Sequence, residues 1–99
     1  MKDNIQIYND LLHECSDQMN QMLEYLQFVN SNRSKGISPK AMKVMKELNH
    51  VVKKLEKLNS HISWYFCSSE QFCKKVAPYQ EKVKKIQREI DELMCSMAS

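Results

Sequence analysis

The sequence has one glycine and two prolines in 99 residues, and it contains no long apolar run. So few turn-forming residues argue against many short strands, and the plentiful Lys, Glu, Gln, Met and Leu favour long helices. No stretch approaches the roughly 20 apolar residues that a transmembrane helix needs. A single glycine also excludes a glycine-rich phosphate loop. We therefore expect one small all-α domain.

Charge is unevenly distributed although the formal net charge is only +3. Residues 3–30 hold five acidic residues and no Lys or Arg, whereas residues 40–57 hold six lysines against two glutamates. This contrast predicts that an acidic first segment lies beside a basic second one. The opening sequence MKDNIQIYND lacks the apolar run of a signal peptide, so we expect an intracellular, cytoplasmic protein, with the nucleus as an alternative. In that reducing environment the four cysteines are expected to be free thiols.

The apolar residues of the first segment recur at alternating spacings of three and four, which predicts a helix over residues 5–29. The seam is Ile5, Tyr8, Leu12, Cys15, Met19, Met22, Leu26 and Val29, widened by Leu11, Leu23 and Tyr25. The polar sequence NSNRSKG predicts a loop over residues 30–38. Ser38 and Pro39 predict the start of the next helix, because serine is a favoured N-cap and proline suits the first helical position.

The same alternation continues from Val44 to Met97, with Ser69 as its one polar member. It predicts a long helix over residues 39–97, roughly 88 Å at about 1.5 Å per residue, with a kink near Pro78. The first helix would cover only half of it. The favoured fold is therefore an antiparallel helical hairpin whose second helix extends as a coiled coil.

The sequence SWYFCSSEQFCKKVAP, residues 63–78, leaves an alternative open. A turn at Ser68-Ser69 would fold the chain into a three-helix bundle, and Ser68 with Gln71 resembles a capping box. The unbroken heptad phase, and the lack of Gly, Asn or Asp between Ser60 and Ala77, favour the long helix instead.

In the hairpin fold the last part of the long helix has no partner within the chain, and burying each large apolar side chain is worth roughly 1.5–3 kcal/mol. We therefore expect residues 70–97 to pack against other helical subunits or a second copy. The predicted partner-binding residues are Trp64, Phe72, Val76, Tyr79, Val83, Ile86, Ile90, Leu93 and Met97. Trp64 lies off the seam and is included because tryptophan is frequent at interface hot spots. The predicted function is a non-catalytic coiled-coil subunit or adaptor.

Other chemistry finds little support in the sequence. Cys67 and Cys73 are six residues apart, unlike the closely paired ligands of zinc sites, so neither a metal nor another cofactor is expected. Nothing resembles a nucleophile with its base, so we expect no enzyme. Contact with nucleic acid or another acidic surface is a weaker hypothesis. Its candidate residues are Lys74, Lys75, Lys82, Lys84, Lys85 and Arg88.

Two stretches resemble known helical families. VAPYQEKVKKIQREIDEL, residues 76–93, resembles the proline-interrupted coiled coil of subunits of the lysosome-related-organelle biogenesis complex. LEYLQFVN with MKELNHVVKKLEKLN is similar to helical subunits of the spindle and kinetochore-associated complex. Both resemblances imply scaffolding without catalysis. The alternatives are a compact three-helix monomeric inhibitor or polyanion-binding protein, and a secreted helical hairpin of the type VII kind, whose Trp-x-Gly turn is absent.

Overall fold

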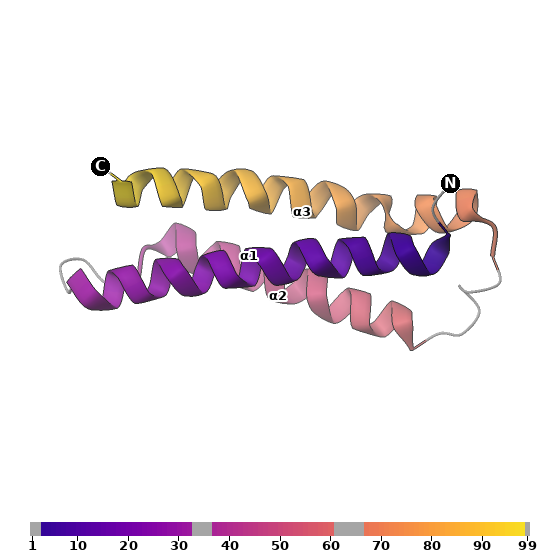
Figure 1. Cartoon of the computed structure of the whole chain (residues 1–99), viewed down its shortest axis with the longest axis horizontal. Helices are drawn as coiled ribbons and strands as arrows, with labels where there is room; N and C mark the ends of the chain where they lie inside the picture. Colours follow the sequence, from indigo (N-terminus) through magenta and orange to yellow (C-terminus); the bar gives the residue numbers. More distant parts are fainter. Residues whose placement is uncertain (1–2, 33–36, 61–66, 99) are drawn as a thin grey trace.

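The computed structural model describes residues 3–32, 37–60 and 67–98 of the chain. They form three α-helices, α1 (Asn4–Asn32), α2 (Pro39–Asn59) and α3 (Ser69–Ala98), and include no strand. α2 runs antiparallel to both α1 and α3, which point in the same direction (Figure 1). The predicted all-α class is confirmed, and the packing of the helices is that of a bundle.

The start of α2 follows the predicted capping chemistry. Ser38 has an extended backbone, and its hydroxyl accepts a hydrogen bond from the Ala41 amide at 3.1 Å, while Pro39 occupies the first helical turn. This bond satisfies one of the amides that a helix start leaves without an intrahelical partner. The Tyr25 hydroxyl of α1 lies 3.3 Å from the same Ser38 hydroxyl, so the cap also joins α1 to α2.

The continuous helix over residues 39–97 is wrong, because α2 ends at Asn59 and α3 begins at Ser69. The start of α3 is a reciprocal capping box. The backbone amide of Gln71 donates a hydrogen bond to the Ser68 hydroxyl at 3.2 Å. The backbone amide of Ser68 donates one to the side-chain oxygen of Gln71 at 3.4 Å. Residues 61–66 of the connection between α2 and α3 lie outside the described residues. Pro78 lies inside α3 with its side chain exposed.

All three helices contribute to one apolar core, with α3 packed against both α1 and α2. The buried apolar residues are Tyr8, Leu11, Cys15, Met22 and Tyr25 of α1, Ala41, Val44, Leu48, Val51 and Leu55 of α2, and Phe72, Val76, Val83, Ile86, Ile90 and Leu93 of α3. The Tyr8 hydroxyl donates to the Leu55 carbonyl at 2.9 Å, which satisfies both buried polar groups. In α2 and α3 the buried residues other than Ala41 are members of the predicted heptad seam.

In α1 the buried face differs from the predicted seam. Ile5 and Met19 were expected in the core, yet they are 50% and 49% exposed. Leu11 and Tyr25, expected only to widen the seam, are buried, and so is Gln18. The face is rotated because α1 packs against two helices. Hydrophobic periodicity could not detect this rotation, because the rotation buries a polar glutamine and leaves apolar residues exposed.

The acidic first segment does lie beside the basic second one, because α1 packs antiparallel against α2. The ion pairs between described residues lie within α2, within α3, or between Lys40 of α2 and Glu92 of α3. In α1, Asp10, Glu14 and Asp17 line hollows that face α3. These acidic residues of α1 therefore border α3, and α1 and α2 are joined by apolar packing and by the hydrogen bonds of Tyr8 and Tyr25.

Candidate protein-binding face

The residues predicted to bind a partner form much of the bundle's own core. Among them Phe72, Val76, Val83, Ile86, Ile90 and Leu93 are buried, and Tyr79 is partly buried. Trp64 lies outside the described residues, and so does the side chain of Met97. The seam of α3 is thus already covered by α1 and α2. No other chain is therefore needed to cover the seam of α3.

The buried side-chain amide of Gln18 joins α1 to α3. The Gln18 side chain is 1% exposed and donates to the Val83 carbonyl at 2.9 Å. Its neighbour Gln87 donates to Gln21 at 3.0 Å and to Asp91 at 2.9 Å. Buried polar groups of this kind favour one register over its neighbours, because a shift would leave the amide without partners. The α1–α3 contact is therefore well specified.

The α1–α2 side of the bundle is different, because large apolar side chains remain exposed there. Met19 and Leu23 of α1 are 49% and 55% exposed, and Met42 of α2 is 48% exposed. A hollow of about 220 Å³ lies between the two helices and is lined by no residue of α3. Its lining residues are Met19, Met22, Leu23, Leu26, Met45, Leu48 and Asn49.

We call this surface the α1–α2 face, defined by Met19, Leu23 and Leu26 of α1 and Met42, Met45 and Asn49 of α2. On this side α1 carries no charged residue. The residues that share this side of α1 are Ile5, Asn9, Leu12, Ser16, Met19, Leu23 and Gln27. Successive members are three or four positions apart, so they align along the helix, and none carries a charge. This side of α1 is therefore uncharged over most of its length.

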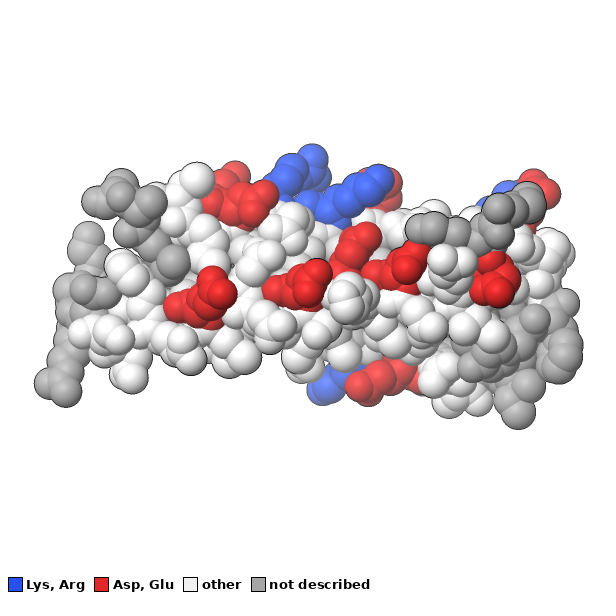
Figure 2. All heavy atoms as spheres, in the orientation of Figure 1, with Lys and Arg blue, Asp and Glu red and all other residues white. Residues whose placement is uncertain are grey.

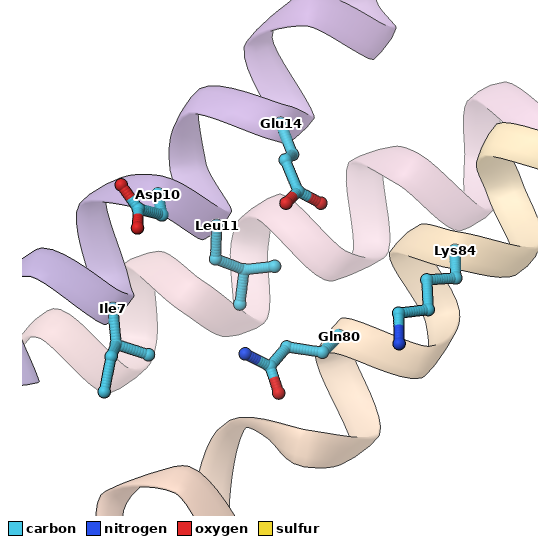
Figure 3. Close-up of a pocket in the computed structure, with 6 residues that line it drawn as sticks. All are labelled: Ile7, Asp10, Leu11, Glu14, Gln80 and Lys84. Atoms are coloured by element: carbon cyan, nitrogen blue, oxygen red, sulfur yellow. The ribbon is translucent and has the colours of Figure 1, made fainter. Parts of the chain in front are cut away.

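The opposite side of α1 is acidic. Figure 2 shows a row of acidic side chains along α1, with the visible surface below it, toward α2, largely uncharged. Part of the row borders a polar hollow of about 240 Å³ between α1 and α3 (Figure 3). Asp10 and Glu14 line it from α1, and Gln80 and Lys84 line it from α3. The acidic row and the α1–α2 face therefore lie on two sides of the same helix.

The basic residues of α3 do not form one separate patch. All six candidates for contact with an acidic surface are exposed. Three of them lie 3.9 Å from carboxylates of their own helix: Lys74 from Glu70, Lys84 from Glu81 and Lys85 from Glu89. Because these carboxylates partly cancel the positive charge, the surface of α3 is mixed in sign. Such a surface attracts a polyanion weakly.

The thiols are spread through the bundle. Cys15 is buried, Cys67 is half-buried, and Cys73 and Cys95 are exposed, all as free cysteines. Burial, with a smaller contribution from Glu14, raises the pKa of Cys15 to about 11. Among the described residues, no three His, Cys, Asp or Glu side chains are grouped so that they could hold a metal ion.

No family model matches the chain, and neither a curated protein nor a solved structure is significantly similar to it. The resemblances to subunits of the two helical complexes therefore stay predictions. Within the described ranges, no helix is both long and apolar enough to cross a membrane.

Proposed function

We propose that this chain is a non-catalytic helical protein that acts as a subunit or adaptor, and that it binds another helical protein through the α1–α2 face. The observation that carries this proposal is the exposure of Met19 and Leu23, which line one apolar hollow, together with that of Met42 on the neighbouring helix. Larger groups of exposed apolar residues on soluble proteins commonly mark binding sites.

The composition of the α1–α2 face supports a protein partner. The centres of protein interfaces are depleted in charged residues and enriched in methionine. Here Met19, Met22 and Met45 line the hollow, and methionine adapts its shape to an incoming side chain because it is unbranched. A groove between two helices also suits the apolar stripe of a third helix, in the manner of helix-in-groove recognition.

The free energy available from this face fits a reversible complex. Fully burying a Leu or Met side chain contributes roughly 1.5–3 kcal/mol. Met19, Leu23 and Met42 are each about half exposed, so covering the three contributes roughly 2–5 kcal/mol before the cost of association. Neighbouring contacts must add to this value. A dissociation constant of about 1 μM corresponds to about 8 kcal/mol, so these neighbouring contacts would supply the larger share.

Site-specific photo-crosslinking tests the proposal. A benzophenone amino acid is introduced at Leu23 or Asn49 on the face, and at Arg88 on the exposed side of α3 as the matched control. The tagged chain is expressed in the cells that naturally produce it. We expect a defined crosslinked protein species from both face positions and none from Arg88. Equal crosslinking at all three positions, or none at Leu23 and Asn49, would contradict the proposal.

A further inference from the structure

We propose that the partner helix on the α1–α2 face is amphipathic, with acidic residues along the flank of its apolar stripe that faces α2 and none along the flank that faces α1. This inference rests on the proposed function, because it names the chemistry of the protein that binds the same face. It is carried by the different charges at the two edges of the face.

The edge of the face on α2 is basic. Lys46 lies four residues after Met42 and three before Asn49. Lys53 lies four residues after Asn49, so helical spacing places both lysines beside the face. Both are exposed, and neither forms an ion pair with another described residue. Glu56 follows Lys53 by three residues and does not line the hollow. The two lysines therefore leave positive charge along this edge.

The edge of the face on α1 is uncharged. Asn20 and Gln27 are exposed and lie three residues before and four residues after Leu23, on its outer side. The acidic row lies farther round α1, because Asp17 and Glu24 precede Asn20 and Gln27 by three positions each. An acidic side chain of a partner over this edge would therefore approach carboxylates, whereas one over the α2 edge would approach lysines.

These two edges determine which charges suit a partner helix. A helix that lies along the groove places its apolar stripe over Leu23 and the hollow, and its two flanks over the two edges. Opposite charges across an interface favour the correct partner, and like charges disfavour a wrong one. Acidic residues are therefore favoured only on the flank over α2. An anionic lipid surface is disfavoured, because it would extend over both edges and meet the acidic row of α1.

Selection from a displayed library of helical peptides tests this chemistry. Each peptide has a fixed leucine stripe, and the residues on its two flanks are varied among Glu, Gln and Lys. The full chain is the bait, and peptides that also bind the Leu23→Glu chain are discarded, so that the remaining binders occupy the α1–α2 face. We expect enrichment of Glu on one flank of the stripe and not on the other. Equal enrichment of Glu on both flanks, or on neither, would overturn the inference.

Charge reversal in the chain tests the basic edge directly. Lys46→Glu combined with Lys53→Glu should raise the dissociation constant of a selected peptide about five- to fiftyfold, because exposed attractive contacts become repulsive. Lys75→Glu combined with Lys82→Glu is the matched control. These lysines of α3 are also exposed and seven residues apart, and the net charge changes by the same amount. The control should change the constant by less than about threefold, and circular dichroism confirms that both chains keep their helix content. Equal weakening by both double variants would show attraction by net charge alone and would overturn the inference.

Crosslinking in cells separates this inference from the proposed function. If Leu23 still gives an undiminished crosslinked species in the chain with Lys46→Glu and Lys53→Glu, the partner lacks the acidic flank, and the proposed function stands without this inference. A crosslinked species of twice the chain mass would identify a second copy. Binding to phosphatidylserine vesicles that Leu23→Glu abolishes would identify a lipid surface. Either result would overturn the acidic helix as the occupant, whereas the absence of any crosslinked species contradicts the proposed function itself.

Discussion

Replacing Ile86 by alanine should destabilise the isolated chain strongly, because Ile86 is fully buried between the helices. The change removes three carbons from the core. At about 0.8 kcal/mol for each buried carbon, the transfer of these atoms to water accounts for roughly 2.4 kcal/mol. The cavity left behind adds to this loss, so we expect a total of about 3–4 kcal/mol. Small domains are stable by about 5–15 kcal/mol, so the variant should fold with a much reduced margin.

Leu23→Ala is the matched control, because it also removes three carbons but from a side chain that is 55% exposed. Its expected cost is about 1 kcal/mol, since less than half of the side chain is buried and water can occupy the space. Urea unfolding, followed by circular dichroism at low protein concentration, measures both free energies. If the two variants lose equal stability, α3 is not part of an internal core and the bundle is wrong.

Three further predictions follow from local contacts. Between about pH 9 and pH 11 the free energy of unfolding should fall with rising pH, because the folded state keeps the Cys15 proton that the unfolded state loses; in Cys15→Ala this part of the pH dependence should be absent. A maleimide should label Cys73 and Cys95 rapidly in the folded protein and Cys15 only after unfolding, as mass spectrometry of digested samples can show; fast native labelling of Cys15 would contradict its burial. Ser38→Ala should cost about 1 kcal/mol through loss of the N-cap, whereas Ser16→Ala, inside α1 and exposed, should change the free energy of unfolding little.

Much of the architecture could be predicted from the sequence. The alternation of three- and four-residue spacings identified the buried residues of α2 and α3 apart from Ala41. Ser38-Pro39 marked the start of α2 because both residues act locally. The break between α2 and α3 was underestimated. The heptad phase is the same on both sides of it, so periodicity alone does not distinguish one long helix from two helices that share a core. The capping box of Ser68 and Gln71 was the local signal for the break.

The candidate site was harder to predict, because it depends on which way α1 faces. Ile5 and Met19 resemble core residues by hydrophobicity, and Gln18 resembles a surface residue. In the structure Gln18 is buried and donates a hydrogen bond to the Val83 carbonyl of α3, whereas Ile5 and Met19 are exposed. This arrangement follows from the packing of α3 on α1. The uncharged residues along one side of α1 were nevertheless visible in the sequence. Looking for sides of a helix without charge, as well as sides rich in apolar residues, would have indicated the α1–α2 face.

Methionine oxidation tests the central claim most directly, because the chain carries its own probes on both sides of α1. Met19 and Met42 are about half exposed, and Met22 is 3% exposed. Peroxide oxidation of each residue in the folded chain is followed by mass spectrometry. We predict that Met19 and Met42 are oxidised quickly and Met22 slowly. Oxidation of Met22 as fast as Met19 would contradict the account.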